Sequence, residues 1–80
     1  AYEGFVTASI AIGRAEEAYV KAKAATERWP DNAKGYDLLG WAALETERMD
    51  EAKTALKKAV EMDPFLTEAK ERLGKLKIEN

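Results

Sequence analysis

The chain repeats its own pattern at an offset of 34 residues, which separates Pro30 from Pro64. A shift by this offset superposes Tyr2 on Tyr36, Ala8 on Ala42, Arg14 on Arg48, Glu17-Ala18 on Glu51-Ala52, Lys23 on Lys57, Ala25 on Ala59 and Glu27 on Glu61. A third, partial copy places Leu39-Gly40 on Leu73-Gly74. A period of about 34 residues is typical of stacked helical hairpins, none of which buries its apolar face alone. The period therefore predicts an all-α array that offers a surface to partners.

The composition excludes most kinds of catalytic or metal chemistry. The 80 residues allow one small domain, and they include neither cysteine nor histidine. Disulfides and thiolate metal sites are therefore excluded, and the commonest general base is missing. The formal net charge of −2 is spread over both signs without a basic patch, so we expect no nucleic-acid partner. We expect no cofactor and no enzyme activity.

The chain contains no apolar run close to the ~18 residues that a membrane span needs, so we expect no membrane insertion. It begins at Ala1, within a repeat, which suggests a fragment or a processed product. The missing secretory signal then leaves the compartment open. A soluble, cytoplasmic protein is the default expectation.

Five helices are expected, separated by prolines, glycine and capping residues. They run from about Tyr2 to Ile12, from Ala15 to Arg28, from a cap at Asp31 or Asn32 to about Thr46, from Asp50-Glu51 to the residue before Asp63, and from about Thr67 onward. The paired carboxylates Glu16-Glu17 and Asp50-Glu51 could serve acid–base chemistry. Their equivalent places in two first turns favour stabilisation of the helix dipole instead.

Small residues are expected where helices approach closely. Ala18, Ala25, Ala52 and Ala59 recur on one face of the second helix of each hairpin, and Gly40 and Gly74 recur in the first. The expected core residues are Leu39, Leu56, Val60, Met62, Phe65 and Leu73.

These positions make the chain resemble the tetratricopeptide repeat family. The best copy runs from Ala33 to Pro64 and carries Tyr36, Leu39-Gly40, Ala52, Leu56, Ala59 and Asp63-Pro64 in the family's order. The resemblance implies a right-handed superhelix (α-solenoid) of five helices in a single domain, residues 1–80. We divide it into an N-terminally incomplete first repeat (1–30), a second repeat (31–64) and a C-terminal capping helix (65–80). Val6 stands at the glycine position of the first copy, which predicts looser packing there, and Lys77 suits a terminal helix.

The resemblance also implies a concave groove, lined by the first helix of each hairpin, that binds a peptide or partner helix. The groove residues are expected to be Thr7, Ile10, Lys34, Asp37, Leu38, Trp41, Leu44, Arg72 and Lys75. Trp41 has two open interpretations, as a binding anchor or as a core residue between first helices. Some family members grip a C-terminal carboxylate, but of the matching residues Glu3, Thr7, Leu38, Glu68 and Arg72 only Arg72 fits that role.

The leading hypothesis is a non-catalytic protein–protein interaction scaffold. Two alternatives stay open: an assembly module that self-associates through its N-terminal end, where Tyr2 and Phe5 lie, or a partner-recruiting segment of a larger enzyme. The partner is a protein or peptide whose identity the sequence does not reveal.

Overall fold

A computed structural model of the chain describes the backbone of residues 2–78 and the side chains of residues 3–76. This part of the chain folds into five helices: α1 (Tyr2–Ala11), α2 (Ala15–Arg28), α3 (Ala33–Glu45), α4 (Met49–Met62) and α5 (Thr67–Ile78). The predicted all-α architecture of five helices is confirmed. The Lys77 side chain, for which solvent exposure was expected, lies outside the described residues. The same holds for residues 79–80, the last of the expected capping helix.

Local signals at the helix ends explain why the boundaries were predictable to within one or two residues. Gly13 adopts a left-handed conformation with φ 84°, which ends α1. Glu47 holds φ 63° at the equivalent turn after α3, 34 residues later. The Asn32 side chain accepts a hydrogen bond from the Lys34 amide at 3.2 Å, so Asn32 is the N-cap of α3.

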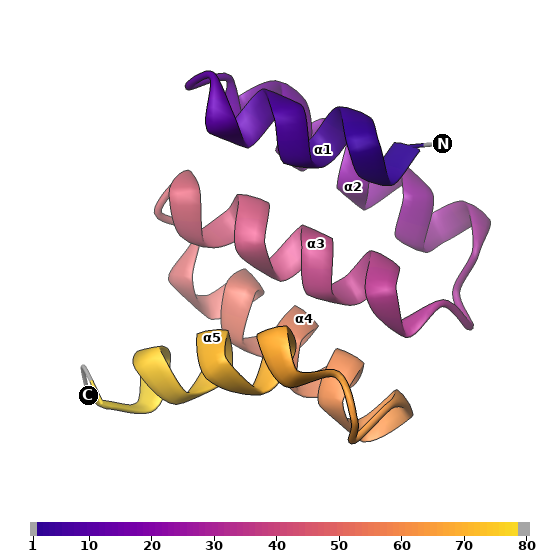
Figure 1. Ribbon diagram of the computed structural model, residues 1–80, viewed down its shortest axis with the longest axis vertical. Coiled ribbons are helices and arrows are strands. Elements are labelled where there is room, and N and C mark those ends of the chain that lie inside the picture. Colours follow the sequence, from indigo (N-terminus) through magenta and orange to yellow (C-terminus); the bar gives the residue numbers. More distant parts are fainter. Residues whose placement is uncertain (1, 79–80) are drawn as a thin grey trace.

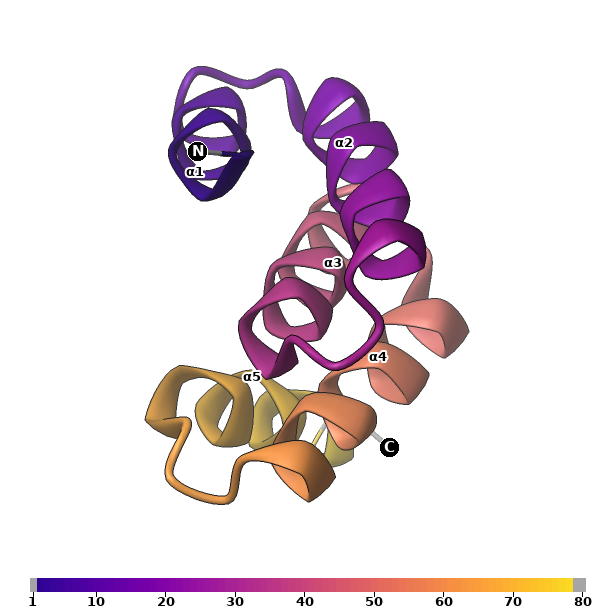
Figure 2. The same ribbon diagram turned by 90° about the vertical axis from the view of Figure 1, so that its right-hand side faces the viewer.

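The helices form two layers. Helices α1, α3 and α5 lie side by side in one layer, and α2 and α4 lie behind them (Figure 1). Each rear helix packs against two front helices, α2 against α1 and α3, and α4 against α3 and α5. Figure 2 shows α1 and α5 displaced to the same side of α3, so the front layer is concave. Its concave side is called the inner face below.

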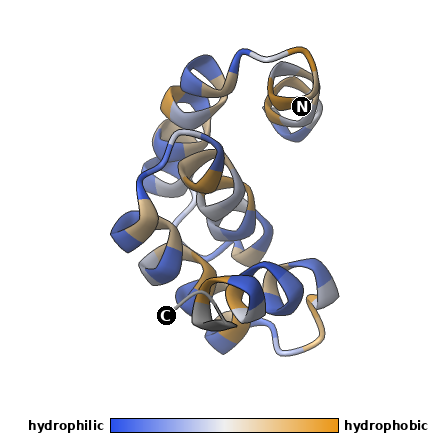
Figure 3. Cartoon of the chain, turned by 90° about the vertical axis from the view of Figure 1, so that its left-hand side faces the viewer, coloured by the Kyte–Doolittle hydropathy of each residue, from blue (hydrophilic) through white to orange (hydrophobic). Residues whose placement is uncertain are grey.

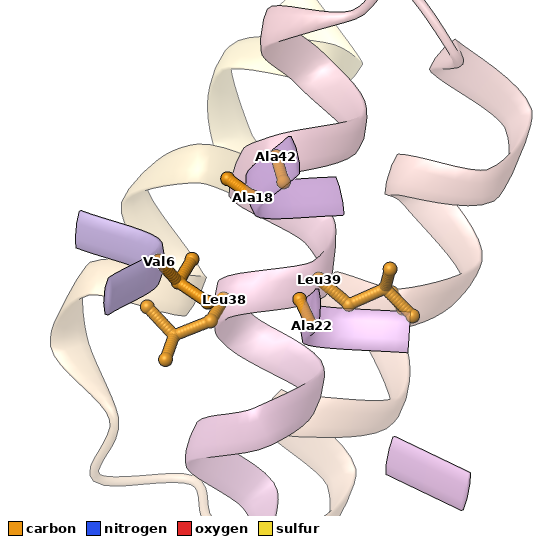
Figure 4. Close-up of a cluster of buried hydrophobic side chains, with 7 residues drawn as sticks. Val6, Ala18, Ala22, Leu38, Leu39 and Ala42 are labelled. Carbon is orange, nitrogen blue, oxygen red and sulfur yellow. The ribbon is translucent and has the colours of Figure 1, made fainter. Parts of the chain in front are cut away.

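Two adjoining clusters of buried side chains form the core. The first contains Val6, Ala18, Ala22, Leu38, Leu39, Ala42 and Ala55 (Figure 4), and the second contains Ala43, Ala52, Leu56, Ala59, Ala69, Leu73 and Leu76. The alanines expected at close helix contacts are buried. Val6 is fully buried beside Leu38 (Figure 4), so the side chain that replaces a glycine here fills space in the first cluster.

The two glycines of the repeat have different surroundings. A Cβ built on Gly40 would collide with the Leu56 side chain, whose Cδ2 would lie at 2.6 Å, and it would approach the Ala52 carbonyl oxygen at 3.4 Å. The predicted close approach of α3 and α4 at Gly40 is therefore confirmed. A Cβ on Gly74 would meet no atom within 4 Å among the described residues. The expected close packing at Gly74 is wrong, because α4 contacts α5 through Leu73 and Leu76 instead.

Phe65 is not a core residue, contrary to the sequence-based expectation. Its side chain is 91% exposed. The Phe65 amide donates a hydrogen bond to Asp63 Oδ1 at 3.1 Å within the turn that precedes α5. In this turn Leu66, the next residue, packs against the second cluster in its place. Within the described residues, no helix is both long and apolar enough to span a membrane.

Polar side chains join the first hairpin to the second on the outer side of the core. Glu51 on α4 accepts hydrogen bonds from Tyr19 Oη and Lys23 Nζ, both at 2.8 Å. Arg48 donates two hydrogen bonds to Glu16, at 3.0 and 3.2 Å, and its guanidinium lies 3.9 Å from the centre of the Tyr19 ring. The hydrogen bond from Lys23 lowers the pKa of Glu51 and raises the pKa of Lys23. Glu16 and Glu51, each in the first turn of its helix, therefore join the two hairpins.

Replacing Glu51 with Gln is expected to lower the free energy of unfolding by about 1 kcal/mol near neutral pH, because Gln keeps the bond from Tyr19 but loses the charge. The lowered pKa of Glu51 means that its contribution exists above the unfolded value of about 4.3 and disappears as the pH falls through the folded value. The raised pKa of Lys23 means that its contribution exists below about 10.4 and disappears as the pH rises through the folded value.

Urea unfolding of the wild type and Glu51→Gln between pH 3 and pH 11 measures this profile. The difference between the two proteins should be constant from about pH 5 to pH 10 and shrink on both sides. Glu61→Gln, on the exposed side of the same helix, is the matched control and should change stability little. A difference that does not shrink at acid pH would contradict the bridging role of Glu51.

Candidate partner-binding face

A buried ion pair joins α3 to α5, two of the three helices of the inner face. Asp37 on α3 is fully buried, and Arg72 Nη1 on α5 donates a hydrogen bond to its Oδ1 at 2.6 Å. Lys34 Nζ lies 3.8 Å from Asp37 Oδ2, an atom that has no hydrogen-bond partner among the described residues. An ionised carboxylate is costly to bury unless cations compensate it. The Asp37–Arg72 pair therefore links α5 to α3.

Arg72 also stacks on Trp41. The guanidinium carbon lies 4.5 Å from the centre of the indole ring, a distance typical of cation–π contacts. Trp41 is partly buried and packs against the first core cluster with its apolar body. The Arg72 side chain is only 20% exposed, because Asp37 and Trp41 enclose it. Trp41 thus has a packing role, and its side chain is only partly buried.

Two residues expected in the groove are buried and do not present their side chains to a ligand. Leu38 is 2% exposed and belongs to the first core cluster with Val6 of α1, and Asp37 is turned toward α5. The reason lies in the neighbours of α3. Residues at a spacing of three and four share one face of a helix, but α1 and α5 cover the two margins of that face. Leu38 is therefore a core residue, and the expectation that it offers an apolar contact to a ligand is wrong.

The remaining predicted residues lie on the three helices of the inner face with different exposures. Thr7 on α1 and Lys75 on α5 are exposed, whereas Ile10 and Leu44 are half-buried against the first and second core clusters. Lys34 lies within 4.0 Å of Glu68 as well as near Asp37. Direct contacts join Lys34, Asp37, Trp41 and Arg72 into one group, which we call the Trp41 cluster.

The Asp37–Arg72 pair was missed in the sequence, although a signal for it existed. Arg72 follows Asp37 by 35 residues, one more than the repeat period. First helices of successive hairpins lie side by side, so residues about one period apart come into contact. Lys34 and Glu68, separated by 34, meet in the same way. Opposite charges at this separation are therefore candidate bridges.

The described residues offer no group of three acidic side chains that could hold a metal ion. The chemistry available at the Trp41 cluster is that of recognition, namely an aromatic edge, cations and hydrogen-bonding groups.

Comparison with known families agrees with this architecture. Residues 33–65 match the sequence pattern of the family described as Tetratricopeptide repeat. This segment, less than half of the chain, is similar to a tetratricopeptide repeat. The repeat comprises α3, α4 and the turn that follows, so its first helix carries Lys34, Asp37 and Trp41. No curated protein matches the chain significantly. Tetratricopeptide repeats are interaction modules that stack side by side, as the five helices do here.

Proposed function

We propose that this protein is a non-catalytic interaction module that binds a peptide or a partner helix on its inner face. The observation that carries the proposal is the Trp41–Arg72 stack above the buried Asp37. It holds a partly buried aromatic ring of α3, the middle helix of the concave layer, against Arg72 of α5. Tryptophan and arginine are the side chains most often found at energetically dominant positions of interfaces.

Charged side chains of both signs lie on the same helices as this ring and its Arg72 partner. Lys34 and Lys75 lie beside Glu68 and Glu71 on the same layer, and Thr7 adds a hydroxyl on α1. An apolar anchor with a polar surround is the usual anatomy of an interface. The ligand that fits is an extended or helical segment with one apolar side chain for Trp41 and charges of both signs on either side of it. Lys34, Arg72 and Lys75 would set its register.

Selection of peptides from a displayed library on the folded protein tests this proposal. A Trp29→Phe background leaves Trp41 as the sole indole, so its emission reports directly on the inner face. Selected peptides should shift that emission, and Trp41→Ala should weaken their binding by 1–2 kcal/mol, about tenfold or more. Circular dichroism of each variant checks that the helices are intact.

Trp29→Ala is the matched control, since Trp29 is 48% exposed in the turn between the hairpins. It should leave the affinity unchanged. Because Trp41→Ala also removes packing, Lys75→Glu provides a second variant at an exposed position of the same face, and it should change the charge preference of the selected peptides. Equal affinities for wild type and both variants would contradict binding at this face.

A further inference from the structure

Two hollows occupy equivalent places in successive hairpins. The first, about 400 Å³, is lined by Leu39, Asp50, Glu51, Thr54, Ala55 and Lys58 of the second hairpin, together with Tyr36 and Lys23. The second, about 420 Å³, is lined by Phe5, Glu16, Glu17, Val20, Lys21 and Ala24 of the first hairpin. Every residue of the second hollow lies 34 positions before a residue of the first. The repeat thus presents the same surface twice.

At the second hairpin, helix α2 borders the hollow and covers the adjoining face of α3. Ala18 and Ala22 of α2 pack in the first core cluster with Leu38, Leu39 and Ala42 of α3, which are 6% exposed or less. Small side chains at a spacing of four allow two helices to approach closely. Lys23 of α2 forms one wall of the hollow and bonds to Glu51.

At the first hairpin the equivalent face of α1 is exposed. The α1 residues equivalent to Leu38, Leu39 and Ala42 are Gly4, Phe5 and Ala8, and all three are exposed. Phe5 is 47% exposed and Val20 on the adjoining α2 is 64% exposed. Figure 3 shows hydrophobic segments on α1 near the N-terminus. No described helix packs on this side of α1. We call this surface the α1 platform; it consists of Gly4, Phe5 and Ala8 on α1 with the adjoining Arg14, Glu17 and Val20.

Charged residues of the platform repeat those that hold α2 in place. Glu17 is the counterpart of Glu51, which binds Lys23 and Tyr19, and Arg14 is the counterpart of Arg48, which binds Glu16. Arg14 and Glu17 are 64% and 57% exposed and lie 3.7 Å apart. Such an exposed pair contributes little by itself and leaves both groups accessible.

From this correspondence we propose that the α1 platform docks an amphipathic helix of a partner protein with the chemistry of the buried side of α2. That helix carries small residues at positions i and i+4, an aromatic ring at i+1, a cation at i+5 and a carboxylate at i−2. In α2 these are Ala18, Ala22, Tyr19, Lys23 and Glu16. The cation meets Glu17, the carboxylate meets Arg14, and the small residues lie on Gly4, Phe5 and Ala8. This surface lies apart from the Trp41 cluster and extends the function beyond the inner face.

A second copy of this chain does not supply such a helix. Its α2 already packs on its own α3, and in α4 the positions equivalent to Tyr19 and Ala22 are Lys53 and Leu56, so the aromatic ring and the second small residue are both missing. In addition, α5 packs against α4. The partner is therefore a different helix.

The test uses a peptide with the sequence of residues 14–30, since α2 is the helix that fits the equivalent surface. In the peptide, Val20→Glu and Ala24→Lys are joined by a lactam on the side opposite Ala18 and Ala22, which keeps the peptide helical, as circular dichroism verifies. The isotope-labelled protein is titrated with this peptide and followed by NMR. Saturable changes at the amides of Gly4, Phe5 and Ala8 are expected.

Variants of the protein identify the contacts. Phe5→Ala should weaken binding about tenfold or more, whereas Phe65→Ala, the same change at an exposed position of the far hairpin, should not alter it. Glu17→Lys should weaken binding about tenfold, and a peptide with Lys23→Glu should restore it. Trp41→Ala should leave this binding unchanged, which separates the platform from the inner face.

Three results would overturn the proposal. The first is an absence of spectral change with a helical peptide and a folded protein. The second is a response centred on Leu38 and Leu39, which would show that the peptide displaces α2 from its own site. The third is concentration-dependent dimerisation of the protein that protects Phe5, which would assign the platform to a second copy.

Discussion

Replacing Arg72 with Met should lower the free energy of unfolding by about 3 kcal/mol. The substitution keeps most of the apolar volume that packs on Trp41, but it removes the hydrogen-bonded cation of a fully buried carboxylate. Lys34 then remains as the nearest cation, with its Nζ 3.8 Å from Asp37 Oδ2. Removal of one partner of a buried pair is destabilising because the other charge stays desolvated. Urea denaturation of wild type and variant measures the loss.

The companion variant Asp37→Asn separates the buried charge from the packing of Arg72. In the Arg72→Met background, Asp37→Asn should recover part of the stability, because it removes the uncompensated charge. Lys75→Met, an equivalent loss of a cation at an exposed position of α5, should change stability by less than about 0.5 kcal/mol. If Arg72→Met and Lys75→Met have equal effects, the pair does not hold α5 against α3.

Gly40→Ala should lower the free energy of unfolding by about 2 kcal/mol, although alanine is the better helix former. The added Cβ collides with Leu56, which is fully buried in the second core cluster and has little room to move. The two helices must therefore separate, or Leu56 must leave its rotamer. Thermal and urea unfolding measure the change.

Gly74→Ala is the matched control, because it makes the same change at the equivalent position of α5. A Cβ there meets nothing within 4 Å among the described residues, so helix propensity dominates, and this variant should be more stable by up to about 1 kcal/mol. In addition, Leu56→Ala should cost less in the Gly40→Ala background than in the wild type, since it makes room for the new methyl group. Equal signs for Gly40→Ala and Gly74→Ala would contradict the close packing at Gly40.

The number, type and approximate limits of the helices were predictable because their signals are local. Asn32 caps α3 through its own side chain, and Gly13 ends α1 by its left-handed conformation. The close approach at Gly40 was also predictable, since a glycine within a helix is costly and is favoured where another helix packs closely. In contrast, Phe65 was expected in the core as a large apolar residue, and Gly74 was expected at a close helix contact by analogy with Gly40. The structure leaves Phe65 91% exposed, and a Cβ on Gly74 would meet no atom within 4 Å among the described residues.

The candidate site was predictable as a set of helix faces, but the contacts within it were not. Helical spacing placed Asp37, Leu38 and Trp41 on one side of α3, whereas their burial depends on α1 and α5, which lie beside α3 in the folded protein. Tyr19 and Glu51 meet across 32 residues, and neither residue alone signals this contact.

The sequence by itself determined that this protein is a stack of helical hairpins with a period of 34 residues, because periodicity, caps and small residues act within a hairpin or between equal positions. Only the tertiary structure decided which repeated positions are covered. Leu39 is buried beneath α2, while its counterpart Phe5 is exposed on α1. The physical reason is that burial depends on the neighbouring helix, so identical positions of a repeat become core or surface according to what packs against them.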